Sequence, residues 1–426
     1  MTSASRSAAA ADRGGALDVL VVGGGLAGAC AGALLQRASG PGTPLSVAVL
    51  EHSVPSAPES GAPLDARVSA LSRASERILR RAGAWERIER ARLKSYERMR
   101  IWHHCVGPWS ADVLVFDAAD VGEPDLGHIA ENRVVQAAAV EAFERAGGRL
   151  IPGDLLALRS GDGCVEAQTS AGRLEARLVV GADGARSAVR EAIGITADRS
   201  SYRQTAIVAN VSTERAHGRT AYQRFLGTGT LALLPLADGS SSIVWSADEA
   251  VAEALIAGSD AEFERALGGA SDEVLGPVRL AGKRAAFPLH RLRAHRYSAR
   301  RCALIGDAAH VVHPLAGQGA NLGLLDAAAL AEVVVSAVRE GEDPGAELPL
   351  RRYERWRKSE IELMAAAIDA FDRLLAHGTH PLARAAQRGL GLVNRSRAAK
   401  RILISRALGL AGELPEAARD CASSAA

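Results

Sequence analysis

Apolar residues gather in short runs along the chain, and these runs predict buried strands joined by helices. Val19–Val22 form one run, and the alanine-rich residues 27–38 that follow have the composition of a helix. LSVAVLE (45–51) is the next strand. Two more apolar strands occur far downstream, in ARLVVGADG (176–184) and RCALIGD (301–307), and a long apolar helix follows the second. We therefore expect an α/β fold with a Rossmann-like, mixed parallel sheet.

Other parts of the chain alternate between apolar and polar residues, as in TAIVANVS (205–212) and SSSIVWSA (240–247). A period of two predicts strands with one buried face, so we expect a mostly antiparallel sheet there. The predicted organisation is a disordered tail at 1–16, a parallel-sheet domain assembled from 17–95, 130–195 and 295–345, an inserted β-sheet domain from 96–129 and 196–294, and a helical region at 346–426.

The glycine cluster after the first strand has the spacing of a phosphate-binding turn. Gly23, Gly25 and Gly28 form G-x-G-x-x-G between a strand and a helix. Glycine permits the turn, the approach of a pyrophosphate and the packing of helix on strand. Glu51 ends the second strand, where a carboxylate can bind ribose hydroxyls. The alternatives are a glycine turn without a ligand and a membrane segment, for which the uncharged run falls short of about 20 residues.

Two aspartates at the ends of later strands bear on which dinucleotide is bound. Asp183 lies in Gly-Ala-Asp-Gly, and Asp307 follows Gly306 where its strand breaks. Carboxylates placed there can hold sugar or ribityl hydroxyls. Three such segments, far apart in the chain, favour one extended cofactor, FAD, over a compact NAD site. The alternatives are a helix cap for Asp183 and a simple strand-end turn for Asp307.

Composition narrows the function classes. The chain has 426 residues, which is longer than a single hydrophobic core usually supports, so more than one domain is expected. Of these residues 48% are hydrophobic, as in a globular protein. A net charge of +2 gives no reason to expect a nucleic acid partner. The five cysteines are scattered without metal-ligand spacing, which fits a reducing compartment such as the cytoplasm. His103 and His104 would point to opposite faces of a strand, so we expect no metal site.

The three glycine- and aspartate-bearing segments together resemble the para-hydroxybenzoate hydroxylase type of FAD-dependent aromatic monooxygenase. More narrowly, the chain is similar to the ubiquinone-biosynthesis hydroxylases, from about residue 17 to about residue 411. The stretches that carry this likeness are DARVSALSRASERILRRAGAWERI (65–88), GHIAENRVVQ (127–136), SYRQTAIVANV (201–211), RFLGTGTLALLPL (224–236) and HPLAGQGANLGLLDAAAL (313–330). The last is highly specific, and the first resembles members that act at ring carbons 5 or 6.

The resemblance implies where the adenosine and pyrophosphate parts of FAD would lie. The three glycines of the first turn would hold the pyrophosphate, with Glu51 on the adenosine ribose and Gln136 near the adenosine half. Asp183 would lie close to the pyrophosphate. Arg67 resembles an arginine that contacts the cofactor beside a mobile flavin; the alternative is a surface helix cation beside Asp65.

The resemblance also implies a position for the reactive ring of the flavin. Gly306 and Asp307 would bind the ribityl chain. The loop from Pro314 to Asn321, which includes Gly317, Gly319 and Ala320, would pass along the isoalloxazine. Backbone N–H groups and a helix N-terminus there would stabilise the anionic reduced flavin.

Two residues at the start of this loop are candidates for contact with the reacting groups. Pro314 resembles a proline whose carbonyl faces the substrate hydroxyl. His313 is a candidate catalytic residue, although a histidine beside a cofactor loop is as often a packing residue. No general base is evident.

The activity implied is hydroxylation of the aromatic ring of a polyprenylated phenol in ubiquinone biosynthesis. NAD(P)H would visit transiently to reduce FAD, and O2 would give a flavin C4a-hydroperoxide whose distal oxygen attacks the ring. The alternatives are a flavin hydroxylase of a soluble aromatic compound, a reductase of prenyl double bonds, and a non-catalytic flavin-bearing subunit of a quinone-biosynthesis complex. WHHC (102–105) and Gln223-Arg224 depart from the subfamily pattern and leave the substrate open.

A basic stretch near the C-terminus suggests contact with a membrane or a partner. Eight arginines and lysines and no acidic residue occur from Arg373 through Gly412, interleaved with leucine, isoleucine and valine at helical spacing. Such a helix can lie on an anionic membrane surface, here the inner face of the cytoplasmic membrane. The alternative is a helix that packs on the catalytic domain or on partner subunits with a solvated basic face.

Overall fold

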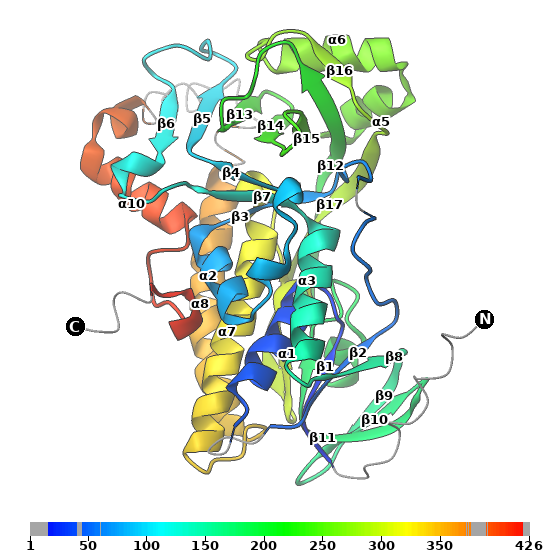
Figure 1. Ribbon diagram of the computed structural model, residues 1–426. Helices are drawn as coiled ribbons and strands as arrows, with labels where there is room; N and C mark the ends of the chain where they lie inside the picture. The colour runs from blue at the N-terminus through cyan, green and yellow to red at the C-terminus, as the bar shows by residue number, and fades with distance from the viewer. Residues whose placement is uncertain are drawn as a thin grey trace.

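A computed structural model describes residues 16–40, 45–59, 61–371, 373, 375, 389 and 391–420 of the chain. Figure 1 shows an elongated molecule, with one region built around β1 and its neighbouring helices and a second region formed by the sheet that contains β12 to β15. Of the tail expected at 1–16, only Ala16 lies among the described residues.

An eight-stranded sheet forms the core of the first region. Its central strands run parallel in the order β19-β11-β1-β2-β8, while β18, β10 and β9 add antiparallel pairs. The middle of β1 is fully buried, which is why its sequence is a continuous apolar run. The strands are β1 (Leu17–Val22), β2 (Val47–Glu51), β8 (Arg149–Pro152), β9 (Leu155–Ser160), β10 (Val165–Thr169), β11 (Gly172–Gly181), β18 (Ser298–Ala299) and β19 (Cys302–Leu304). The expected mixed parallel sheet is confirmed.

Helices cover this sheet, and α7 lies at their centre, packed on α1, α2 and α8. By length and composition α7 could cross a membrane, but 78% of its apolar window is buried inside the protein, as in the core helix of a globular fold. The α-helices of the described residues, of which α5, α6 and α10 belong to the second region, are α1 (Leu26–Ala38), α2 (Arg73–Arg81), α3 (Asn132–Arg145), α4 (Ala188–Ala192), α5 (Glu249–Ala257), α6 (Asp260–Ala270), α7 (Gln318–Arg339), α8 (Glu347–Phe371) and α10 (Arg397–Ala407).

A nine-stranded, mostly antiparallel sheet forms the second region, in the order β20-β17-β12-β15-β14-β13-β5-β6, with β16 beside β12. Its apolar residues alternate between a core beneath α5 and α6 and the opposite face, as expected from the sequence. The strands are β5 (Arg98–His103), β6 (Leu114–Asp117), β12 (Ala197–Thr213), β13 (Thr220–Leu226), β14 (Gly229–Pro235), β15 (Ser241–Asp248), β16 (Val278–Leu280), β17 (Ala285–Ala294) and β20 (His310–Val311).

A small three-stranded sheet, β3-β7-β4, completes the fold. Its strands are β3 (Val68–Leu71), β4 (Leu93–Tyr96) and β7 (Gly127–Glu131). The domain boundaries given above stay a prediction.

The two adjacent histidines do not point to opposite faces, so that expectation is wrong. Strand β5 ends at His103, and His104 lies in the following turn, where the alternation of a strand no longer applies. Their ring centroids are 4.1 Å apart, and Cys105 brings a third potential ligand atom close to them.

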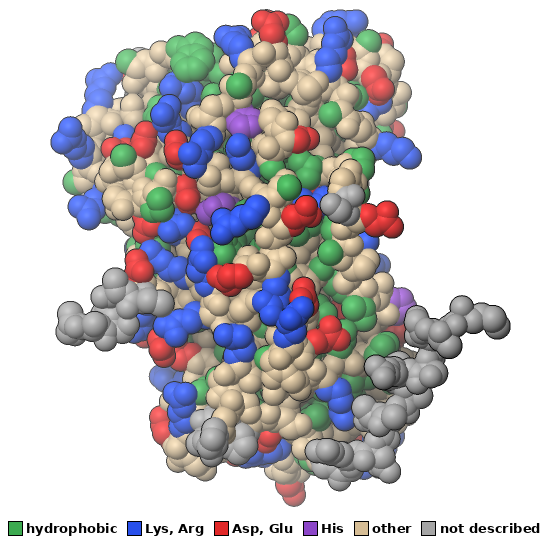
Figure 2. Space-filling view, in the orientation of Figure 1, with side chains coloured by type: hydrophobic (Ala, Val, Ile, Leu, Met, Phe, Trp, Pro, Cys, Tyr) green, Lys and Arg blue, Asp and Glu red, His purple; other side chains and the backbone are tan. Residues whose placement is uncertain are grey.

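The part of the basic C-terminal stretch from residue 391 onward packs on the second region. Ile404 of α10 and Leu408, which directly follows the helix, are buried in a cluster with residues of β5 and β6. Lys400 pairs with Asp120 at 2.7 Å, and Arg395 pairs with Asp112 at 3.2 Å. These contacts agree with a helix that packs on its own protein. On the face shown in Figure 2, basic and acidic side chains are interspersed.

Candidate functional site

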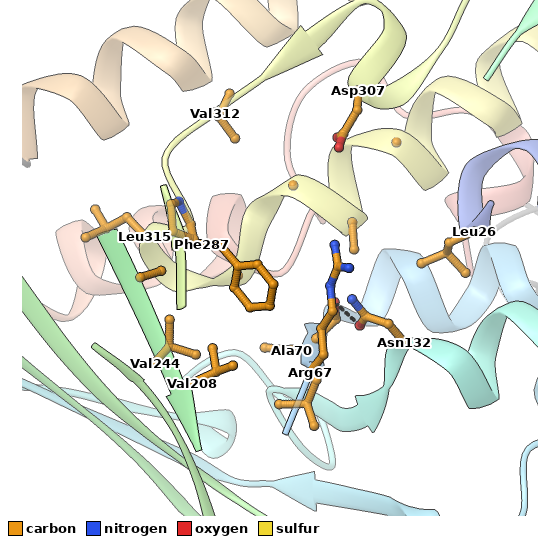
Figure 3. Close-up of a pocket in the computed structure, with 18 of the residues that line it drawn as sticks. Leu26, Arg67, Ala70, Asn132, Val208, Val244, Phe287, Asp307, Val312 and Leu315 are labelled. Atoms are coloured by element: carbon orange, nitrogen blue, oxygen red, sulfur yellow. Dashed lines mark hydrogen bonds between the residues drawn. The ribbon is translucent and has the colours of Figure 1, made fainter. Parts of the chain in front are cut away.

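One cavity of about 710 Å³ lies between the two regions of the fold. On one side are turns that follow the carboxyl ends of β1, β11 and β19, where open α/β sheets bind ligands. The inner face of the nine-stranded sheet forms the other side, and Figure 3 shows Val208, Val244 and Phe287 there, opposite Asp307. Among the residues named above, the cavity is lined by Gly25, Arg67, Gln136, Gly306, Asp307, His313, Pro314, Gly317, Gly319 and Ala320.

The glycine turn after β1 has room for a ligand at one of its three glycines. Gly23 has a φ of 100°, and a Cβ there would clash with the carbonyl oxygen of Ala182. A Cβ at Gly28 would clash with the carbonyl oxygen of Gly23. Gly25, in contrast, has nothing within 4 Å of its Cβ position and lines the cavity. Two glycines thus serve packing, and the third leaves a space that fits a phosphate group.

Glu51 and Gln136 both form hydrogen bonds with the backbone of Gly24. The Glu51 carboxylate accepts a short hydrogen bond from the backbone N–H of Gly24 and a second, at 3.1 Å, from that of Ser53. The Gln136 amide donates to the carbonyl oxygen of Gly24 at 2.9 Å. The structure therefore places both residues at the glycine turn, which sets its shape from two sides.

Asp183 contacts a helix and also keeps one oxygen without a partner. Its Oδ2 accepts from the backbone N–H of Val189 at 3.0 Å, in the first turn of α4, as the helix-cap alternative expects. Its Oδ1 is buried and has no hydrogen-bond partner within the described residues. Its neighbours Ala182 and Gly184 line the cavity. An unpaired carboxylate oxygen beside the cavity fits a hydroxyl or N–H of a bound cofactor.

Asp307 is surrounded by protein on almost all sides, yet its carboxylate is accessible because it faces the cavity. This burial raises the pKa of Asp307, against the attraction of His310 and Arg67. Arg67 lies just before β3 rather than on a surface helix, and its guanidinium is 5.6 Å from the centre of the Phe287 ring. Figure 3 shows the side chains of Arg67 and Phe287 pointing into the cavity.

The loop expected from Pro314 to Asn321 is shorter than predicted, because a single helical turn spans Leu315–Gly317 and α7 begins at Gln318. The side chain of Asn321, in the first turn of α7, fixes this segment. Its Oδ1 accepts from the N–H of Ser72 at 3.0 Å and from the Ser75 hydroxyl at 2.7 Å. Its Nδ2 donates to the carbonyl oxygen of Ala70 at 2.9 Å. The side chain therefore ties the start of α7 to β3 and α2. Pro314, Leu315, Gly317, Gly319 and Ala320 of this segment line the cavity.

His313 lines the cavity, but its ring is held by neighbouring residues. Its Nε2 is 2.8 Å from Oε1 of Gln204, and the ring packs edge-on against Tyr202 at 4.9 Å. Pro314 lines the cavity beside it. These contacts agree with the packing alternative for His313, and its direct role stays a prediction.

Two buried charged residues that sequence reasoning missed connect the cofactor segments. Asp326, fully buried in α7, accepts from the N–H of Gly306 at 3.0 Å, from Nε of Arg357 at 2.8 Å, and bonds Nε2 of His310 at 2.6 Å. Burial alone would raise the pKa of Asp326, but His310 and Arg357 lower it below its ordinary value. Arg190 donates to the carbonyl oxygens of Ala308 and Ala185 at 2.7 and 2.8 Å. In the sequence, the one signal for Asp326 and Arg190 is their position inside or directly after the glycine- and aspartate-bearing segments.

Comparisons with known proteins agree with this geometry. The family model described as an FAD binding domain matches residues 16–365. A ubiquinone hydroxylase, UbiL, of Rhodospirillum rubrum is 38% identical over 94% of this chain and 92% of its own length. A 3-demethoxyubiquinol 3-hydroxylase of Escherichia coli is 35% identical over 92% and 98%.

Solved structures show the same fold. The p-nitrophenol 4-monooxygenase PnpA of Pseudomonas putida superposes with a TM-score of 0.72, at 23% identity, over 92% of this chain and 98% of that one.

Proposed function

The chain belongs to the FAD-dependent monooxygenases, and from that premise we propose that it hydroxylates the aromatic ring of a polyprenylated phenol in ubiquinone biosynthesis. Support comes from relatives named as ubiquinone-pathway hydroxylases that match the chain over almost its whole length. The observation that carries the proposal is a single cavity in which the cofactor turns face an apolar wall. Such a cavity suits a cofactor and an aromatic, lipid-tailed substrate together.

The residues of the cavity fit FAD at several points. The open space before Gly25 would take the pyrophosphate, and Asp183 and Asp307 would hold hydroxyl groups. Backbone N–H groups between Gly317 and Ala320 would lie along the isoalloxazine. Bound FAD would supply oxygen activation, through the C4a-hydroperoxide expected above.

The protein itself would orient the ring and exclude water. The wall facing the cofactor turns is formed largely by apolar residues, which leave room for a planar ring. We place Pro314 and its neighbour His313 beside the ring, on the side of the cofactor turns. Transient reduction by NAD(P)H and hydroxylation at ring carbon 5 or 6 are further parts of the proposal.

Oxygen incorporation tests the activity. Purified protein should be yellow, and it should oxidise NAD(P)H faster when a short-chain prenylated phenol is added. With ¹⁸O₂, the product should gain one labelled oxygen atom. Colourless protein that stays colourless with added FAD, or product without the label, would overturn the proposal. Turnover of soluble phenols alone would move the substrate outside the quinone pathway.

The ring position is tested in cells. Mass spectrometry of quinone intermediates in a strain lacking this protein should show one accumulated precursor that lacks a single ring hydroxyl. The position of that missing hydroxyl identifies the step. A normal quinone profile in such a strain would contradict the assignment to the pathway.

We also propose a peripheral position at the cytoplasmic face of the membrane, with possible subunits of a quinone-biosynthesis complex nearby. A lipid-tailed substrate supports this, as do the exposed side chains of Leu392 and Ile402 beside the basic residues of the C-terminal stretch. Flotation with anionic vesicles tests it, and replacement of both residues by serine should reduce binding. Equal flotation of the double variant would contradict the membrane contact.

A further inference from the structure

The sheet face that lines the cavity is apolar with three exceptions on adjacent strands. Val208, Val244 and the alanines Ala206, Ala221 and Ala232 show the usual composition of this wall. The exceptions are Gln223 on β13, Thr230 on β14 and Ser246 on β15. All three are buried from outside solvent, with exposed fractions of 3%, 5% and 3%.

The register of the strands brings these three side chains together. Thr230 lies directly opposite Ser246 in the β14–β15 pair. Gln223 lies opposite Ala232, so it is the diagonal neighbour of Thr230 on the same face. Diagonal neighbours are about 7–8 Å apart at their backbones, within reach of a long side chain. The three form one polar patch, called here the Gln-Thr-Ser patch.

At the centre of the Gln-Thr-Ser patch is a polar group for which the described residues provide no partner. The Thr230 hydroxyl is buried and makes no hydrogen bond within the described residues. The side chains of Gln223 and Ser246 line the cavity beside it, where a ligand can reach them. Buried polar groups are nearly always paired, so an unpaired Thr230 hydroxyl between two other polar side chains of the cavity wall points to a ligand that pairs with it.

The neighbouring Arg224 does not belong to the patch. Its guanidinium lies on the opposite face, where it donates to the carbonyl oxygens of Gly269 and Ala270 at 2.9 Å and pairs with Asp272 at 2.7 Å. The patch itself therefore contains only uncharged donors and acceptors. Such groups match a hydroxyl, which both donates and accepts, better than a carboxylate, which needs a cation or several donors.

We propose that the Gln-Thr-Ser patch binds a ring hydroxyl of the substrate and so determines which ring carbon faces the flavin. This inference rests on the proposed aromatic hydroxylation and deepens it. The apolar wall around the patch would hold the ring by its faces, while the patch fixes its rotation. Two of the three residues belong to β14 and β15 at the middle of the sheet, so the contact would be rigid.

Binding of a matched pair of ligands tests the patch. The probes are a short-chain 2-prenylphenol and the prenylbenzene that lacks its hydroxyl, titrated against the FAD-loaded protein by the change in flavin absorbance. Wild-type protein should prefer the phenol. The variants Gln223→Leu, Thr230→Val and Ser246→Ala should each reduce that preference about 3- to 10-fold, the value of one lost neutral hydrogen bond. Their affinity for the prenylbenzene should not fall.

Ser241→Ala is the matched control. Ser241 is also on β15 with a buried, unpaired hydroxyl, but it alternates onto the face away from the cavity. This variant should keep the wild-type preference. If the wild-type protein binds and hydroxylates the phenol but the three patch variants keep its full preference, only the role of the Gln-Thr-Ser patch is overturned. Wild-type protein that binds no phenol would overturn the proposed function as well.

Discussion

Gly25 and Gly28 belong to one motif, but the structure predicts opposite results for their replacement by alanine. Gly25 has φ −61° and ψ 178°, which any residue can adopt, and nothing lies within 4 Å of its Cβ position. Gly25→Ala should therefore leave the FAD-free protein folded. The added methyl group would instead occupy the cavity where the pyrophosphate is expected, and FAD binding should weaken by at least about tenfold, or about 1.4 kcal/mol.

Two small effects on the FAD-free protein oppose each other in Gly25→Ala. Alanine restricts the unfolded chain, which stabilises the fold by about 0.4–1 kcal/mol where the backbone is compatible. Gly25 is also the N-cap of α1, where alanine is less favourable than glycine by roughly 0.5–1 kcal/mol. The net change in the free energy of unfolding should thus stay within about 1 kcal/mol.

Gly28→Ala has a steric cost in the protein itself. Its Cβ would overlap the carbonyl oxygen of Gly23 and lie 2.9 Å from the Cβ of Ala182, on a buried helix face. Backbone cannot yield as a flexible side chain does, so the cost should reach or exceed the 1–3 kcal/mol of an overpacked core. Gly28→Ala should therefore lower the free energy of unfolding of the protein even when no FAD is present.

Urea unfolding of the FAD-free proteins and fluorescence titration with FAD separate the two effects. The reasoning predicts a normal urea midpoint with weak FAD binding for Gly25→Ala, and a lowered midpoint for Gly28→Ala. If Gly25→Ala binds FAD as the wild type does, the pyrophosphate does not lie at this turn. If Gly28→Ala unfolds at the wild-type midpoint, the packing argument is wrong.

Three other changes test the buried contacts around the site. Asp326→Asn should lower the free energy of unfolding by about 3–5 kcal/mol at pH 7, because it leaves Arg357 without a buried anion. Because the folded pKa of Asp326 is depressed, its stabilisation is complete above the ordinary value of about 3.9 and is lost as pH falls through the folded pKa. The urea difference between variant and wild type should therefore shrink below about pH 4, and a constant difference would refute the charge argument. Arg190→Met should cost about 3 kcal/mol and weaken FAD binding, and unchanged melting and titration curves would show that its two backbone contacts are dispensable. Glu51→Gln replaces one of the two oxygens that accept from Gly24 and Ser53 by an amide NH2, so it should loosen the glycine turn and weaken FAD binding in the same fluorescence titration, and unchanged affinity would show that the carboxylate is dispensable.

The strand–glycine–helix segments of the fold could be predicted from the sequence because each carries a local signal. The fully buried strand β1 reads as a continuous apolar run, and the alternation in β12 and β15 marks a sheet with one face in the core. The turn at Gly25 follows from the spacing of three glycines. These features depend on near neighbours in the chain, so one sequence suffices.

What the sequence could not give are contacts between residues far apart in the chain. His103 and His104 were misplaced because the end of β5, rather than the strand period, decides where the second ring lies. The Gln-Thr-Ser patch depends on which strands are adjacent and on their register, which no local pattern encodes. For the basic C-terminal stretch, composition allowed both a membrane surface and an intramolecular contact, and burial of Ile404 in α10 supports the second.

The cofactor turns are coupled through single side chains that bond to backbone. Gln136 of α3 holds the first turn at Gly24, Arg190 of α4 holds the third at Ala308, and Asp326 of α7 holds it again at Gly306. In each case the side chain belongs to a helix, and the backbone group that it bonds lies in a turn after a strand, β1 or β19, from another part of the chain. A displacement of one turn would therefore strain the others, and a long cofactor that touches all three would meet them already in register. Such mutual support lowers the ordering required on binding, which is why segments so far apart in the chain can serve one ligand.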